Sequence, residues 1–191
     1  MFSFNGDLFL HIVGALGLFV ALGLEWASLS YLRRAATVEQ AREWLSMFNA
    51  QRRIYPLSWL AILIPGFYMA AAAWRGVAWI TIALAAVVLL VVLGVALTGR
   101  RLAPIGQSVA AESGSISSTL RQRLDDPLLW ASLWIRTGIA LGIVFLMTIK
   151  PDLFGALITM GVAVVLSMAF SLPAWGRNQE KVQAKQAGDR L

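Results

Sequence analysis

Apolar residues gather along the chain into five long runs that polar segments separate. Each run is close to the 20 or so residues that an α-helix, rising about 1.5 Å per residue, needs to cross the hydrocarbon core of a bilayer. The runs cover residues 8–32, 55–74, 77–98, 128–149 and 153–172. The pattern predicts an all-α fold, in which residues 1–191 form one domain with five transmembrane helices.

The second and third runs are joined only by Arg75 and Gly76, which predicts a tight antiparallel hairpin. Pro65 lies inside the second run. Because proline has no backbone N–H, it should kink that helix and free a carbonyl group. We therefore expect an irregular backbone in the middle of the second helix.

Two longer connections remain, and both are polar. In the first, Thr37 and Gln40 have the spacing of a capping box, and apolar residues at helical spacing follow them. This predicts an amphipathic helix at about residues 38–51 that lies on the cytoplasmic membrane surface. The second connection, residues 99–127, is rich in serine and then basic, and is expected to be a mobile cytoplasmic loop with a short helix.

The composition supports a membrane protein over a soluble one. Hydrophobic residues make up 59% of the chain and charged residues 14%, against about 45–50% and about 25% in soluble domains. The chain has no cysteine and a single histidine. This excludes disulfides, iron–sulfur clusters, thiolate zinc sites and a multi-histidine metal site within one chain.

The positive charges predict an orientation. Five Lys and Arg residues fall in residues 33–54, four in residues 99–127 and four after residue 173, which is 13 of the 16 in the chain. Cytoplasmic loops carry such an excess, so the N-terminus should lie outside and the C-terminus in the cytoplasm. No basic patch is interleaved with aromatic residues in a polar domain, so nucleic acid is not an expected partner.

Glu25 and Arg136 are the acidic and the basic residue that lie within the runs. Each is about seven or eight residues from the cytoplasmic end of its helix, which puts both roughly 10–12 Å deep. Equal depth and opposite charge predict an intramembrane ion pair. The pair is either a structural clamp between the first and fourth helices or part of a site that carries protons or a substrate anion.

His11 lies about one turn below the outer surface. It is either an interfacial histidine that hydrogen-bonds a neighbouring helix or the axial ligand of haem b in the outer half of the bilayer. A helical bundle can offer haem a ring of apolar side chains, an imidazole, and surface cations for the propionates. His11 is thus the candidate metal ligand, and haem b the candidate cofactor.

Five residues near the depth of this histidine complete the candidate haem site. Arg75 and Lys150 are the outer cations that would face the propionates. Tyr68, Met69 and Met147 lie at a similar depth, so a second axial ligand is possible. The iron would otherwise be five-coordinate, because bis-histidine ligation needs two chains that share one haem.

Gly138 and Gly142 have the four-residue spacing of a close-packing motif of membrane helices. They lie on the helix face opposite Arg136. The motif packs either against another helix of the chain or against a second subunit. The second alternative predicts a homodimer.

The first run has a Leu-His-hydrophobic-Gly start at Leu10, His11 and Gly14, and ends in Arg33 and Arg34. This tract resembles the opening helix of bacterial predicted integral membrane proteins of unknown function. More distantly, it is similar to the copper-resistance D family and to the membrane protoporphyrinogen oxidase of bacterial haem synthesis. The oxidase family's histidine is tied to haem, so the resemblance implies haem at His11, in a bacterial inner membrane. The copper-binding groups and the intramembrane lysine of these families have no recognisable counterpart here.

Three classes of function follow from these patterns. The first is haem b binding through His11, with a role in electron transfer or haem handling. The second is a small-molecule or proton-coupled transporter that uses a pocket at Glu25 and Arg136. The third is a structural membrane subunit without a ligand. The chain shows no phosphate-binding glycine loop and no nucleophile–base pair, so no catalytic residues are assigned and an enzyme is not expected.

Overall fold

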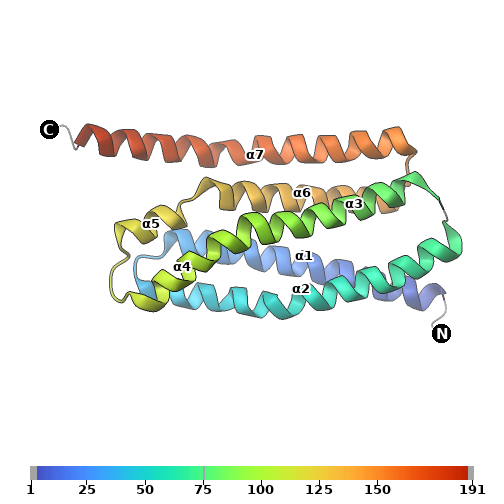
Figure 1. Ribbon diagram of the computed structural model, residues 1–191, viewed down its shortest axis with the longest axis horizontal. Helices are drawn as coiled ribbons and strands as arrows, with labels where there is room; N and C mark the ends of the chain where they lie inside the picture. The colour runs from blue at the N-terminus through green and yellow to red at the C-terminus, as the bar shows by residue number, and fades with distance from the viewer. Residues whose placement is uncertain (1–3, 75, 189–191) are drawn as a thin grey trace.

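The computed structural model describes residues 4–74 and 76–188, and their elements are all helical (Figure 1). The elements are α1 (Phe4–Arg34), α2 (Val38–Ala73), α3 (Ala78–Leu93), η1 (Gly94–Gly99), α4 (Arg100–Ala111), α5 (Ser118–Leu124), α6 (Pro127–Ile149) and α7 (Leu153–Gly188). Five helical stretches in this part of the chain are long and apolar enough to cross a membrane. This confirms the predicted all-α membrane fold with five spans.

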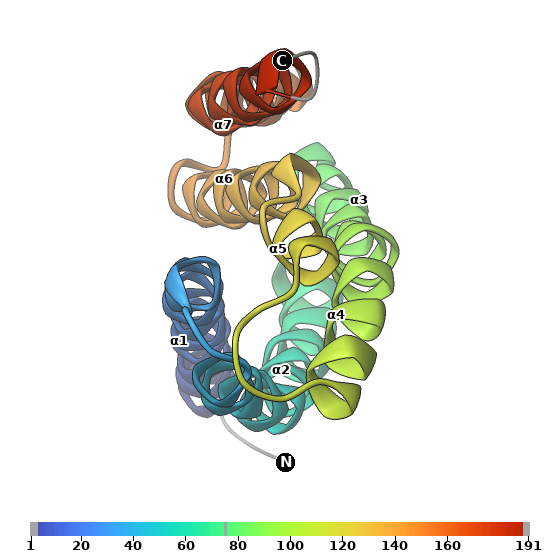
Figure 2. The ribbon, with the colours of Figure 1, turned by 90° about the vertical axis from the view of Figure 1, so that its left-hand side faces the viewer.

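The long helices run alternately in opposite directions, so successive connections lie at opposite ends of the bundle (Figure 1). α1 and α2 pack as a hairpin, α3 packs against α6, and α7 lies outermost against α6 and α3 (Figure 2). We call the end that holds α4 and α5 the arginine-rich end, after Arg33, Arg42, Arg101, Arg121 and Arg123. The α2–α3 and α6–α7 connections lie at the opposite end.

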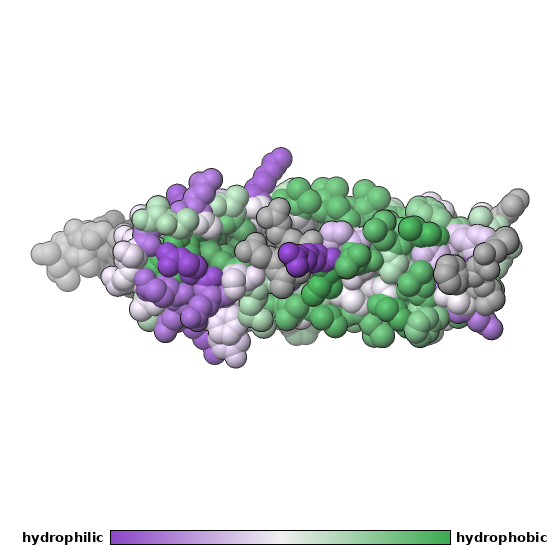
Figure 3. Space-filling model, turned by 90° about the horizontal axis from the view of Figure 1, so that it is seen from below, coloured by the Kyte–Doolittle hydropathy of each residue, from purple (hydrophilic) through white to green (hydrophobic). Residues whose placement is uncertain are grey.

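The surface of the bundle is suited to lipid. Apolar side chains cover a broad band of the face in Figure 3, and polar side chains gather at the arginine-rich end. Large apolar side chains such as Phe154 and Phe9 are 72% and 68% exposed. A water-soluble protein rarely exposes such a continuous apolar surface, whereas the hydrocarbon of a bilayer covers it.

The amphipathic segment at 38–51 is not a separate surface helix. α2 runs without interruption from Val38 to Ala73 and includes both this segment and the second span. Its start has the predicted cap: Thr37 Oγ1 accepts from the Gln40 N–H at 3.3 Å, and Gln40 Oε1 accepts from the Ala36 N–H at 2.9 Å. No glycine follows before the second span begins, so nothing in this stretch ends the helix.

The 99–127 connection is also mostly helical, which corrects the prediction of a mobile loop with one short helix. α3 continues through the π-helical turn η1 directly into α4, and α5 follows after a short break. The reason is packing: Ile105 and Val109 of α4 are one helical turn apart and both are buried in the core, with Leu120 and Leu124 of α5. The apolar face is thus buried although the segment reads as polar overall.

Arginine side chains tie the connections of the arginine-rich end together. Arg121 of α5 donates to the backbone carbonyls of Arg33 at 2.7 Å and Ala35 at 2.5 Å, at the C-terminus of α1. Arg42 of α2 donates to the carbonyl of Val109 in α4 at 2.9 Å. These bonds satisfy carbonyl groups that a helix end leaves without an internal partner.

The small-residue motif of α6 is used within the chain. A Cβ atom at Gly138 would clash with Ser167 Oγ and lie 2.8 Å from the Ala163 carbonyl oxygen, both in α7. A Cβ atom at Gly142 would lie 2.8 Å from Met160 Sδ of the same helix. The two glycines therefore bring α6 and α7 together, so the motif itself supplies no argument for a subunit interface.

Candidate functional site

Two cavities lie inside the bundle, one nearer each end. The His11 cavity has a volume of about 400 Å³ and is lined by side chains of α1, α2, α3 and α6. The Glu25 cavity, about 1050 Å³, lies between α1, α2, α3, η1, α4 and α6 toward the arginine-rich end. Trp59 lines both cavities and so lies between them. His11 and the Glu25–Arg136 pair thus line different cavities.

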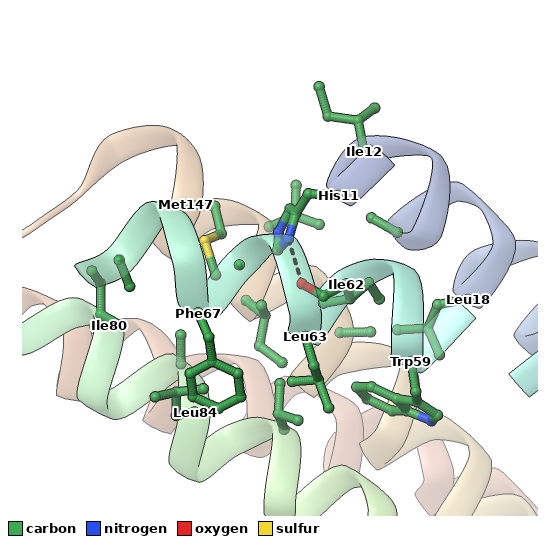
Figure 4. A pocket seen from close by; sticks show the side chains of 18 of the residues that line it. His11, Ile12, Leu18, Trp59, Ile62, Leu63, Phe67, Ile80, Leu84 and Met147 are labelled. Atoms are coloured by element: carbon green, nitrogen blue, oxygen red, sulfur yellow. Dashed lines mark hydrogen bonds between the residues drawn. The ribbon is translucent and has the colours of Figure 1, made fainter. Parts of the chain in front are cut away.

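The His11 imidazole is held by a backbone carbonyl. Its Nδ1 atom lies 2.8 Å from the carbonyl oxygen of Ile62 in α2 (Figure 4). Because a carbonyl oxygen only accepts hydrogen bonds, Nδ1 carries the proton in this contact. In the neutral imidazole, Nε2 then keeps its lone pair, which is the arrangement found in histidines that bind metals through Nε2.

Close contact between α1 and α2 positions this ring. A Cβ atom at Gly14 would lie 2.9 Å from the backbone of Ala61, so α1 approaches α2 as closely as a glycine allows. A Cβ atom at Gly66 would lie 3.1 Å from both Nδ1 and Cε1 of His11, so the imidazole rests against α2 at a residue without a side chain. Pro65, where the sequence predicts an irregular backbone, directly precedes Gly66. The α2 helix continues through it without a break.

Of the other residues predicted for the haem site, Met147 lines the same cavity as His11 (Figure 4). Tyr68 is 41% exposed and Met69 is buried, and neither lines the cavity. Lys150 lies outside the lining, with its Nζ atom 4.6 Å from the ring centroid of Trp74.

Arg75 lies outside the described residues. Within the residues that are described, no cluster of three or more His, Cys, Asp or Glu side chains could hold a bare metal ion.

Glu25 of α1 and Arg136 of α6 form a buried ion pair through Oε1 and Nη2. The two residues are 2% and 4% exposed. Tyr55 of α2 donates from its hydroxyl to Glu25 Oε2 at 2.7 Å, so both carboxylate oxygens have a partner. Three helices therefore meet at one carboxylate, at the wall of the Glu25 cavity.

Tyr55 was missed by sequence reasoning. Its position at the start of the second apolar run is typical of an interfacial aromatic residue. Counting depth does not find it, because the first residue of the second run counts as lying at the membrane surface, whereas Glu25 counts as roughly 10–12 Å deep.

The wall of this cavity on the α6 side is fixed by further polar contacts. Thr98 of η1 and Ser132 of α6 share a hydrogen bond of 3.0 Å between their hydroxyls. Trp26 of α1 donates from Nε1 to Thr137 Oγ1 of α6 at 3.0 Å. A Cβ atom at Gly94 would lie 3.3 Å from Arg136 Nη1, so the π-helical turn begins where the guanidinium needs space. Single π-helical turns are frequent at functional sites.

Comparison of the chain with protein-family models, with curated proteins and with solved structures finds no match in any of the three. The two cavities and their side chains are therefore the features of the molecule that bear on its function.

Proposed function

We propose that this multi-pass integral membrane protein binds haem b in the His11 cavity, with Nε2 of His11 as the axial ligand of the iron. The observation that carries the proposal is the 2.8 Å contact between His11 Nδ1 and the Ile62 carbonyl. Metal-binding histidines commonly donate their second ring N–H to a carbonyl or a carboxylate, which orients the ring and makes the ligating nitrogen more basic.

The cavity suits a porphyrin in its chemistry. Leu63, Leu84 and Ile143 are among its apolar walls, and His11 is the lining residue that offers an imidazole nitrogen to the iron. Ligand pockets of about 300–1,000 Å³ are typical of bound small molecules. Leu16 and Phe67 are 61% and 55% exposed, so the cavity borders on the lipid-facing surface, where the edge of a large macrocycle can extend.

Two further residues support this site. Met147 lines the cavity and would be the second axial ligand, and a His/Met pair raises the reduction potential of haem. Lys150, at the same end of the bundle, would reach the propionates from its place beside Trp74. When bound, haem b supplies a one-electron redox couple, so the role we propose is electron transfer or haem handling.

The resemblance of the first helix to the haem-linked membrane oxidase supports the same assignment. The resemblance also supports a bacterial inner membrane, and the charge distribution supports placing the arginine-rich end in the cytoplasm. In that orientation His11 lies in the outer half of the bilayer.

Haem titration of the purified protein tests the proposal. The wild-type protein should acquire a Soret band at one haem per chain, and His11→Ala should lose it while keeping its helical circular dichroism. Tyr68→Phe, which alters a residue outside the cavity, is the matched control and should bind haem like the wild type. If the wild-type protein gains no Soret band, haem binding is refuted. The structural subunit and the transporter then remain as the possible functions.

A further inference from the structure

Two residues that line the Glu25 cavity have a buried hydrogen-bond donor without a partner in the described chain. Arg136 Nε and Gln51 Nε2 are both buried, in residues 4% and 3% exposed, and neither makes a hydrogen bond within the described part of the chain. They come from different helices, α6 and α2, yet both residues line the same cavity. A buried donor without an acceptor is unfavourable, so the two together call for a ligand that brings acceptor atoms.

The charge of the cavity defines that ligand further. Three charged side chains line it, Glu25, Arg42 and Arg136, which leaves a formal charge of +1. The carboxylate of Glu25 is already used, since one oxygen accepts from Arg136 and the other from Tyr55. One additional negative charge would neutralise the lining, and in a medium of low dielectric constant that attraction is strong.

The rest of the lining is apolar. Phe48 and Trp59 line it from α2, and the α3–η1 side contributes Leu90, Val91 and Val95. Val91 and Val95 are 43% and 66% exposed on the lipid-facing surface, so the cavity borders on lipid beside its charged wall. A cavity of about 1050 Å³ with this lining has room for an apolar chain as well as a polar head.

We propose that the Glu25 cavity is a binding site for the carboxylate head of a single-chain amphiphile, of the fatty-acid type, with its alkyl chain along the α2–α3 wall. A carboxylate has one negative charge and two acceptor oxygens, which match the charge of the lining and its two free donors. A phosphomonoester carries closer to two charges and would overcompensate the lining. This site is separate from the His11 cavity and does not depend on haem.

Quenching of tryptophan fluorescence by 9,10-dibromostearate tests the site in the full-length protein in zwitterionic lipid nanodiscs. Bromine quenches indole at short range, and Trp59 lines the cavity. The expected result is a saturable component, one ligand per chain, that stearate reverses and methyl stearate does not. The ester has the same chain without the charge, and therefore reports partitioning into the bilayer alone.

Two substitutions at Gln51 locate the head group. Gln51→Leu removes the free donor, and Gln51→Glu also cancels the positive charge of the lining. We expect the dissociation constant to rise about tenfold in the first and more in the second, which corresponds to loss of one charge-assisted hydrogen bond and then of the charge match.

Ser28→Ala is the matched control. Ser28 is equally buried, and its Oγ atom also has no hydrogen-bond partner within the described chain, but it does not line the cavity. Ser28→Ala should leave the dissociation constant unchanged. Quenching that does not saturate, equal competition by the ester, or a Gln51→Leu protein with wild-type affinity would each overturn the proposal.

Discussion

Glu25 and Arg136, 111 residues apart in sequence, form a buried ion pair that joins α1 to α6. The same two helices also meet at Trp26 of α1, whose ring contacts those of Trp130 and Trp134 of α6. α1 packs extensively on α2, and α6 on α7. The pair therefore links two helix hairpins, and Tyr55 adds α2 to the same junction.

Breaking this pair one residue at a time should destabilise the protein strongly. Glu25→Gln or Arg136→Gln leaves one buried charge without its partner, which typically costs about 3–5 kcal/mol. The double substitution removes both charges and should be more stable than either single variant. Unfolding in detergent, followed by circular dichroism, measures the three values. If the double variant loses as much as the two single losses added together, the side chains are not coupled.

Tyr55→Phe should remove one hydrogen bond from the Glu25 carboxylate. Such bonds to a charged group contribute about 1.5–3 kcal/mol. The expected loss of unfolding free energy is in that range and should shrink in the Glu25→Gln background, where the acceptor is no longer charged. Tyr68→Phe is the control, because Tyr68 is 41% exposed. Equal effects of the two substitutions would show that the hydroxyl of Tyr55 has no special role.

Part of this architecture follows from the sequence alone. Hydropathy locates the five spans. The rise per residue is the same in every α-helix, so counting residues from the helix ends predicts that Glu25 and Arg136 lie at the same depth. Depth alone does not predict which way a side chain points around the helix axis. Met69 and Met147 lie at similar depth, yet of the two only Met147 lines the His11 cavity. Met69 is buried elsewhere, because the rotation of α2 about its axis directs it away from the cavity.

Other features needed the packing partners. The polar, serine-rich sequence after Arg100 makes it hard to predict that Ile105 and Val109 form a buried apolar pair. They are buried because α5 and the rest of the core pack against them. Likewise, the spacing of Gly138 and Gly142 predicts a close contact but does not say which helix makes it.

Alanine at Gly138 should weaken the contact between α6 and α7. The new methyl group would meet Ser167 and the backbone of Ala163, and such overpacking costs about 1–3 kcal/mol. Gly161→Ala is the matched control in α7, because nothing lies within 4 Å of a Cβ atom there. It should be neutral or stabilise the helix by about 0.5–1 kcal/mol. Thermal unfolding of the two variants measures the difference. Equal melting temperatures for Gly138→Ala and Gly161→Ala would contradict the close α6–α7 contact.

The orientation can be measured directly, because the chain has no cysteine that would interfere. Ser115→Cys places a thiol in the exposed turn between α4 and α5, and Ala73→Cys places one at the exposed end of α2. We expect a membrane-impermeant maleimide to label Ala73→Cys in spheroplasts and Ser115→Cys only in inverted vesicles. The reverse pattern would put the arginine-rich end outside.

The most direct test of haem binding at His11 replaces the ligand and then restores it. His11→Gly removes the imidazole from the cavity, and free imidazole can diffuse into the space. We expect the wild-type protein to show the Soret and α/β bands of an imidazole-ligated haem and the His11→Gly protein to lack them. The bands should return when millimolar imidazole is added. A His11→Gly protein that keeps the wild-type spectrum, or a wild-type protein that never binds haem, would contradict haem binding at His11.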